Sequence, residues 1–173
     1  MENLVTRKNL QTFYSGKKIF LTGHTGFKGS WLMTWLDMWG AQVKGYALQP
    51  EYSGSLYEQM LHFTSVDSVI GDIRDREKLL EEIKSFEPDL IFHLAAQPLV
   101  RLSYTIPIDT FQTNIIGTAN LLDVLKDYEK ACTVVIITTD KVYHNNEWVY
   151  PYRENDRLGG FDPYSSSKAC CEL

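Results

Sequence analysis

A tyrosine and a lysine four residues apart have the types and spacing of a base that acts on alcohols. Tyr164 and Lys168 stand in the stretch Tyr-Ser-Ser-Ser-Lys, and residues i and i+4 share one face of a helix. A lysine ammonium beside a tyrosine favours the phenolate, and a phenolate can remove the proton from an alcohol that is being oxidised. Such a pair is common by itself, and the alternative interpretation is a solvated helix face.

Polar residues that follow an apolar run supply a second group of candidates. Thr139, Asp140 and Lys141 come directly after a β-branched stretch. Thr139 can donate a hydrogen bond to the substrate oxygen that Tyr164 deprotonates. For Asp140 and Lys141 the alternative to a chemical role is an ordinary surface ion pair, which contributes little to stability.

A glycine-rich turn near the N-terminus has the pattern of a phosphate cradle. It reads Gly-His-Thr-Gly-Phe-Lys-Gly and lies between a short apolar run and a helical pattern. Glycines let the backbone approach a pyrophosphate closely, and the helix N-terminus offers free N–H donors to the anion. The alternative is a tight strand-to-helix turn without a ligand. The candidate phosphate-binding residues are Gly23, Thr25, Gly26, Phe27, Lys28 and Gly29.

The residues that would read the rest of a dinucleotide favour NAD over NADP. The position that contacts the ribose is expected at Gln49, about 20 residues beyond the glycines. No arginine or lysine occurs in residues 49–54 to hold a 2′-phosphate. Asp72 and Ile73 are candidates for the adenine contact. An acid pair of Asp72 with Asp75 at a helix N-terminus is the alternative for Asp72.

These groups must be positioned by alternating strands and helices. Apolar runs predict strands, and amphipathic runs predict helices. The pattern is typical of an α/β fold with a doubly wound parallel sheet, Rossmann-like, in the strand order 3-2-1-4-5, which binds ligands at the carboxyl ends of its strands. The predicted strands are 18–22, 43–48, 68–71, 89–93 and 133–138, and the predicted helices are 26–39, 76–86, 108–128 and one from 164 onward, with a short helix within 49–66 and a polar loop at 139–163.

Three tryptophans recur at helical spacing in the first long helix. Trp31, Trp35 and Trp39 alternate with leucines to form one apolar stripe. Packing in the core is a simpler interpretation of this stripe than a platform for a ligand.

Several motifs in this order resemble the extended short-chain dehydrogenase/reductase family, from Phe13 to the last residue. The resemblance implies that Thr139, Tyr164 and Lys168 are catalytic and that Lys168 also holds the nicotinamide ribose of NAD. It further implies that Leu94, Ala95 and Ala96 line a cofactor groove. Asn114 would support the active-site backbone beside the cofactor. The alternative for Asn114 is a simple polar residue of a helix. The motifs are the glycine turn, His93-Leu94-Ala95-Ala96, Asn114 with Gly117-Thr118, Thr139, and Tyr164 with Lys168. We interpret His93 itself as a hydrogen-bonded core histidine.

Four stretches are similar to one subgroup of that family, the CDP-glucose 4,6-dehydratases. Its relatives that act on dTDP- or GDP-sugars have an acidic pair after the threonine, whereas this chain has Asp140-Lys141. The role of Arg101 stays open between a contact to the substrate or a partner loop and a surface arginine. Trp148 and Tyr150 are expected at the edge of a sugar pocket. The four stretches are GHTGFKGSW, AAQPLVRLSY, TDKVY and YREN.

The similarity to this subgroup implies an internal redox cycle on a sugar nucleotide, with CDP-glucose as the substrate. Tyr164 would deprotonate the 4-hydroxyl while NAD takes the hydride from C4. Lys141 would then act as the base at C5, and Asp140 would protonate the departing 6-hydroxyl. The hydride returns to C6, which yields CDP-4-keto-6-deoxyglucose. Another sugar-nucleotide dehydratase, a 4-epimerase and an inert NAD-binding fragment are the alternatives.

The resemblance also implies how the chain is organised. Residues 1–15 are an expected N-terminal extension, and residues 16–173 are an expected NAD-binding domain, truncated before the domain that grips the sugar nucleotide. The helices at 108–128 and 164–173 correspond to the pair that forms homodimers in the family. The flank of the fifth strand is expected to leave apolar surface uncovered.

Composition excludes several other classes of protein. The chain has 173 residues, 44% of them hydrophobic, and a formal net charge of −5, which fits one globular domain and argues against nucleic acid or anionic membrane as a partner. No apolar run is long enough to span a bilayer, and the polar N-terminus lacks a signal-peptide core, so a cytoplasmic location is expected. Three cysteines, two of them adjacent, indicate neither a disulfide framework nor a metal site.

Overall fold

Five parallel strands form the sheet of the protein in a computed structural model, which describes residues 6–126 and 128–173. Their order is β3-β2-β1-β4-β5, which confirms the predicted order. The winding reverses at β1, where Thr22 lies opposite Tyr46 on one neighbour and His93 on the other. The strands are β1 (Lys18–Thr22), β2 (Gln42–Ala47), β3 (Asp67–Ile70), β4 (Leu90–His93) and β5 (Thr133–Ile136).

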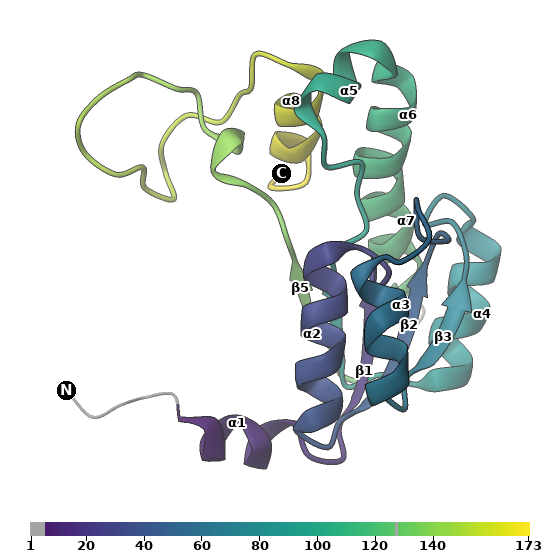
Figure 1. Ribbon diagram of the computed structural model, residues 1–173. Coiled ribbons are helices and arrows are strands. Elements are labelled where there is room, and N and C mark those ends of the chain that lie inside the picture. The colour runs from purple at the N-terminus through teal and green to yellow at the C-terminus, as the bar shows by residue number, and fades with distance from the viewer. Residues whose placement is uncertain (1–5, 127) are drawn as a thin grey trace.

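Helices cover both faces of the sheet, as Figure 1 shows. On one face α2 and α3 pack with η1 beside them, and on the other face lie α4 and α7. Four consecutive residues of β1 are buried, because a parallel strand covered on both sides needs apolar residues at every position. The bounds are α2 (Phe27–Met38), α3 (Leu56–Met60), η1 (Leu61–Phe63), α4 (Arg76–Phe86) and α7 (Gly117–Val124).

The remaining elements lie around the carboxyl edge of the sheet, except for α1 (Arg7–Tyr14) at the opposite end (Figure 1). Near that edge α5 and α6 run into the π-helical segment η2, and α8 packs against them. The long loop at 143–162 extends away from the sheet. The bounds are α5 (Val100–Thr105), α6 (Pro107–Phe111), η2 (Gln112–Ile116), η3 (Asp140–Val142) and α8 (Pro163–Cys170).

The structure differs from the prediction in several helices. Neither α1 nor α5 was predicted, although Thr6 caps α1 by accepting a hydrogen bond from the Asn9 amide at 3.2 Å. The helix predicted at 108–128 begins at Pro107, passes through the π-helical segment and ends at Val124. The helix that begins at Pro163 ends at Cys170, and a short helix lies in 49–66 as predicted. Residues 1–5 of the expected N-terminal extension lie outside the described residues.

The prediction that the tryptophan stripe packs in the core is wrong for two of its members. Trp31 is 39% exposed and Trp35 is 49% exposed. The side of α2 that faces the sheet instead carries Met33 and Leu36, both fully buried. Trp39 alone of the three packs against the core, where it stacks on Tyr14 of α1 at 5.5 Å between ring centroids. Helical spacing identified one stripe but not the side of the helix that meets the sheet.

No helix within the described residues is long and apolar enough to cross a lipid bilayer.

Candidate functional site

The glycine turn at the end of β1 can pack closely against the protein backbone only because two of its residues lack a side chain. A Cβ atom at Gly23 would lie 2.7 Å from the Ala95 amide nitrogen, and a Cβ atom at Gly29 would overlap the Gly23 carbonyl oxygen. Gly23 also has a φ of 75°, which favours glycine. The turn therefore lies directly against the segment that follows β4.

The N-terminus of α2 is open to an anion. Gly26 is its N-cap, and no side chain caps the first turn of the helix, so its first N–H groups are free to bind a phosphate. The Thr25 hydroxyl donates a hydrogen bond to the Leu48 carbonyl at 2.9 Å, which ties the turn to the end of β2. Phe27 and Lys28 are exposed at the start of the helix. The cradle that the six residues form fits a dinucleotide phosphate.

Asp72 and Ile73 follow β3 at the same edge of the sheet, but their side chains have protein partners. The Asp72 carboxylate accepts a hydrogen bond from Arg74 Nη2 at 2.6 Å, and hydrogen bonds from the Arg74 side chain lower the pKa of Asp72. Ile73 is buried in the core, where it would collide with any side chain at Gly117. Asp75, not Asp72, caps the next helix, through a 3.1 Å bond from the Lys78 amide. The alternative of an acid pair at this helix is therefore wrong for Asp72.

The segment at Leu94, Ala95 and Ala96 forms the wall opposite the glycine turn. The preceding residue, His93, is 1% exposed, and its ring nitrogens bond to the hydroxyls of Thr22 at 2.7 Å and Thr118 at 3.0 Å. This confirms the interpretation of a hydrogen-bonded core histidine. Burial, and next the nearby charge of Lys168, lower the pKa of His93 to about 3.

Asn114 joins the segment after β4 to α8. It is fully buried in the π-helical segment, a local widening that frequently occurs at functional sites. Its side chain accepts a hydrogen bond from the Gln97 amide at 2.8 Å and donates to the Gln97 carbonyl at 3.2 Å and the Ser167 hydroxyl at 2.8 Å. These contacts fit a supporting role for the backbone, and direct contact with a cofactor stays a prediction.

Tyr164 and Lys168 lie one turn apart on α8, and both are buried. Tyr164 is 9% exposed and Lys168 is 4% exposed, which excludes the alternative of a solvated helix face. The Lys168 ammonium donates a hydrogen bond to the Ile137 carbonyl at 3.0 Å, just beyond β5, and burial lowers the pKa of Lys168. The two residues keep the i, i+4 spacing on one helix, and proton transfer by Tyr164 stays a prediction.

Two serines that were not singled out in the sequence hold α8 in place. The Ser103 hydroxyl of α5 accepts the Tyr164 amide at 3.2 Å and donates to the Val100 carbonyl at 2.7 Å. Ser167 connects Asn114 to the Tyr164 carbonyl, to which its hydroxyl donates at 2.7 Å. No sequence signal could have found Ser103, because α5 itself was not predicted.

Thr139, Asp140 and Lys141 form the start of η3 at the end of β5. The Thr139 hydroxyl donates a hydrogen bond to the Asp140 carboxylate at 3.0 Å, which brings two of the predicted residues together. Lys141 is exposed, and the ion pairs among the described residues do not join it to Asp140. The alternative of a surface ion pair is therefore wrong, while acid and base roles stay predictions.

Aromatic residues of the long loop stack on one another. The rings of Trp148 and Tyr150 are 4.7 Å apart, and those of Tyr143 and Tyr152 are 5.1 Å apart. The loop projects away from the sheet (Figure 1). A place for Trp148 and Tyr150 at the edge of a sugar pocket stays a prediction.

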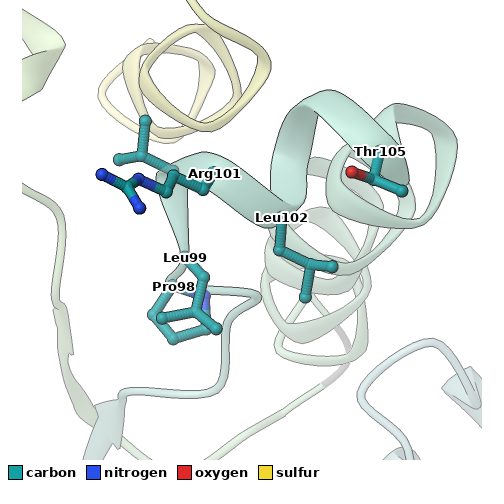
Figure 2. A pocket seen from close by; sticks show the side chains of 6 residues that line it. Pro98, Leu99, Arg101, Leu102 and Thr105 are labelled. Carbon is teal, nitrogen blue, oxygen red and sulfur yellow. The ribbon is translucent and has the colours of Figure 1, made fainter.

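A shallow depression of about 590 Å³ lies along α5. It is lined by residues 98–102 and Thr105. Figure 2 shows the Arg101 guanidinium pointing away from Leu102 and Thr105, and Arg101 has no ion pair among the described residues. Within the same described part of the chain, no group of three or more histidine, cysteine, aspartate or glutamate residues is arranged to hold a metal ion.

Comparison with known proteins finds similarity to sugar-nucleotide dehydratases and epimerases. A family model described as GDP-mannose 4,6 dehydratase matches residues 20–173. The chain is 55% identical over 163 residues to CDP-glucose 4,6-dehydratase of Salmonella typhimurium, covering 94% of this chain and 45% of that protein. It is 30% identical to CDP-paratose 2-epimerase of Salmonella typhi, covering 90% of this chain and 51% of that protein. The chain thus spans about half the length of the curated relatives it matches.

Solved structures with the same fold include enzymes bound to NAD. UDP-glucose-4-epimerase of Stenotrophomonas maltophila, with bound NAD and a formylated UDP-arabinopyranose, has a TM-score of 0.78 and 26% identity, covering 90% of this chain and 46% of that chain. MoeE5 in complex with UDP-glucuronic acid and NAD has a TM-score of 0.74 and 26% identity, covering 90% of this chain and 47% of that chain.

Proposed function

Because the chain belongs to the GDP-mannose 4,6-dehydratase family of extended short-chain dehydrogenases, we propose that it is the NAD-binding part of a CDP-glucose 4,6-dehydratase. One observation carries the proposal. The glycine turn and the buried pair Tyr164 and Lys168 lie at the carboxyl edge of the same parallel sheet, where doubly wound sheets bind their ligands. The 55% identity to a CDP-glucose 4,6-dehydratase supports the choice of sugar nucleotide.

The assignment of NAD is supported by the uncapped start of α2 at the glycine turn and by the residues around it. The free N–H groups at the start of α2 would bind the pyrophosphate. Lys168, beside Ile137, would hold the nicotinamide ribose, and the backbone at Ile73 would meet the adenine. The absence of arginine and lysine from residues 49–54 disfavours a 2′-phosphate. NAD is also the dinucleotide named in the structures of the epimerase and of MoeE5.

The reaction that these residues would carry out begins with proton removal by Tyr164 from the sugar 4-hydroxyl. Bound NAD would accept the hydride from C4 and return it to C6 in the last step. The 4-keto group acidifies the C5 proton, which Lys141 would remove. Asp140 would protonate the departing 6-hydroxyl, and its contact with Thr139 at 3.0 Å would connect that acid to the residue that holds the reacting oxygen. Substrate loses one molecule of water, and the cofactor is not consumed.

There are two alternatives to this proposal. Solved relatives include UDP-glucose 4-epimerases, so a different sugar nucleotide or an epimerisation is a second candidate. A third candidate is that this chain, which covers 45% of the CDP-glucose enzyme, binds NAD without turnover.

We also propose that residues 16–173 form the dinucleotide-binding domain. In the complete enzyme, the helices at 108–128 and 164–173 would form a homodimer. The surface along α6, η2 and α7 supports this, because it exposes the large apolar side chains of Ile108, Ile116 and Leu122. Apolar patches of this kind mark association surfaces.

Binding and turnover experiments test the proposal separately. The chain is titrated with NAD and with NADP by calorimetry, and then incubated with NAD and CDP-, dTDP-, UDP- or GDP-glucose while the 4-keto product is followed by NMR. We expect NAD to bind more tightly than NADP, and CDP-glucose to be the nucleotide sugar converted. A folded chain that binds no dinucleotide would contradict the proposal, and binding without product would favour the third alternative.

A further inference from the structure

A chain of buried hydrogen bonds connects three elements behind the cofactor groove. His93, at the end of β4, bonds through Nδ1 to the hydroxyl of Thr22 on β1 and through Nε2 to that of Thr118 on α7, at 2.7 Å and 3.0 Å. All three side chains are buried, with exposures of 0% for Thr22, 1% for His93 and 4% for Thr118. We call these three residues the clasp.

The position of every proton in the clasp follows from the partners at its two ends. The Thr22 hydroxyl oxygen accepts hydrogen bonds from the Leu94 and Ala95 amides, both at 3.1 Å. A hydroxyl has one proton to donate and two acceptor lone pairs. Because Leu94 and Ala95 occupy both acceptor positions, the Thr22 proton must be donated to His93 Nδ1.

The other end of the clasp leads to the same tautomer. The Thr118 hydroxyl donates its proton to the Asn114 carbonyl at 2.7 Å. It must therefore accept from His93 Nε2, which carries the hydrogen. His93 is neutral with its proton on Nε2. A second proton on Nδ1 would face the Thr22 hydroxyl, whose acceptor positions are already filled.

The clasp lies immediately behind the contact between the two walls of the groove. Leu94 and Ala95 follow the last residue of β4, so the strand ladder no longer holds the Ala95 amide. Thr22 supplies the acceptor that this buried donor needs. On its other side the Ala95 nitrogen contacts Gly23, where an added Cβ atom would come within 2.7 Å.

We propose that Thr22 and His93 are positioning residues for the dinucleotide site, because their clasp holds Leu94 and Ala95 against the glycine turn. The inference rests on the proposed NAD binding and assigns a function to residues that otherwise belong to the core. Neither side chain contacts the cofactor. Their effect is on the backbone that forms one wall of the groove.

The test compares hydroxyl removal at two buried threonines. Thr22→Val removes the hydroxyl that accepts from the Ala95 amide but preserves the shape of the side chain. The Leu94 amide keeps its second acceptor, the Thr22 carbonyl at 3.2 Å. Thr34→Val is the matched control, because Thr34 is also buried and its hydroxyl only donates to the Ser30 carbonyl within α2, at 2.9 Å. We expect Thr22→Val to raise the Kd for NAD at least tenfold, and Thr34→Val to change it less than twofold. Thr22→Ser, which restores the hydroxyl, should recover the affinity of the unmodified chain.

Two measurements test the clasp without NAD, one on the unmodified chain and one that compares it with Thr22→Val. Long-range ¹H–¹⁵N NMR spectra should show His93 as the Nε2–H tautomer at neutral pH. Hydrogen exchange of the Ala95 amide should become at least tenfold faster in Thr22→Val. The Nδ1–H tautomer, or a folded Thr22→Val chain with unchanged NAD affinity, would overturn the inference. An unmodified chain with the expected tautomer but no NAD binding would overturn the proposed function instead.

Discussion

Two histidines, His24 and His93, are fully or almost fully buried, at 0% and 1% exposure. His24 belongs to the glycine turn, and its Nε2 atom forms a hydrogen bond with the Ser68 hydroxyl at 2.7 Å. Burial lowers the pKa of His24 to about 4, despite an opposing contribution from the Tyr46 backbone, and burial with the Lys168 charge lowers the pKa of His93 to about 3. Each histidine therefore stays neutral in the folded chain at a pH where the unfolded chain has already gained a proton.

The folded chain should lose stability in acid because of these two residues. Their pKa is about 6.5 in the unfolded chain, so their contribution is complete above that pH and is lost as the pH falls toward 4 for His24 and 3 for His93. The loss is about 1.4 kcal/mol per pH unit for each histidine. Urea unfolding between pH 7 and pH 5 measures it.

The control for this prediction is an exposed histidine. His24→Asn and His93→Asn should each lower by about one the number of protons that the chain takes up on unfolding, which sets the slope of the unfolding free energy against pH. This holds whatever the substitutions do to stability at pH 7. His62→Asn, at an exposed histidine, is the variant with which both are compared. An unchanged pH dependence in both buried variants would contradict the assignment.

The last and the middle glycine of the turn should differ in their tolerance of a methyl group. Gly29→Ala forces its Cβ atom onto the Gly23 carbonyl oxygen, whereas a Cβ atom at Gly26 would be 3.4 Å from that same oxygen. We expect Gly29→Ala to lower the free energy of unfolding by about 2 kcal/mol, as overpacking does. Gly26→Ala should cost less than about 0.5 kcal/mol. Urea unfolding of the two variants checks this, and equal losses would show that the turn does not have the described geometry.

Hydrogen bonds of Asn114 connect the π-helical segment η2 to the segment after β4 and to α8. The predicted helix at 108–128 is divided by the π-helical segment, which turns Asn114 into the interior toward Gln97 and Ser167. A regular helix would not widen at this point. The interruption therefore connects the segment after β4 to α8, which carries Tyr164 and Lys168.

Loss of the Asn114 amide should destabilise this region strongly. Asn114→Ala leaves the half-buried Gln97 amide and carbonyl without their side-chain partner, and we expect a loss of about 3 kcal/mol in the free energy of unfolding. Gln112→Ala is the matched control, because Gln112 lies in the same segment and is exposed, and it should cost less than about 0.5 kcal/mol. Thermal or urea unfolding measures both. A small effect at Asn114 would mean that water or another group replaces its amide.

One face of the whole molecule is incompletely covered. Trp31 and Trp35 line a hollow of about 340 Å³ on the flank of α2. Val135 on the fifth strand and Ile137 just beyond it are 36% and 37% exposed, as the sequence predicted for this flank. Val135 pairs with Phe92, a residue that packs against the same core cluster as α2, so the hollow and the strand belong to one side of the sheet.

This face should bind an apolar dye. We expect the chain to enhance the fluorescence of anilinonaphthalene sulfonate, and the double variant Val135→Thr, Ile137→Thr to reduce that signal at least twofold. Val149→Thr is the control, since Val149 is fully exposed in the long loop, far from the sheet. A signal that does not change in the double variant would place the dye elsewhere.

Features that depend on residues close together in the chain were predicted from the sequence by itself. The parallel sheet and its order follow from the alternation of apolar runs with helical patterns, and the glycine turn follows from steric limits that act within seven residues. The positions of Tyr164 and Lys168 on one helix face likewise depend only on helical spacing. These properties do not depend on which other elements pack against each helix or strand.

Only the tertiary structure decided which polar side chains meet and which apolar ones stay exposed. Thr22 and His93 are 71 residues apart, and Asn114 and Ser167 are 53 apart, so no local pattern relates them. The same is true of Trp31 and Trp35, whose exposure depends on the side of α2 that meets the sheet. Hydrogen bonds and burial are properties of pairs of elements, and a pair exists only after the chain has folded.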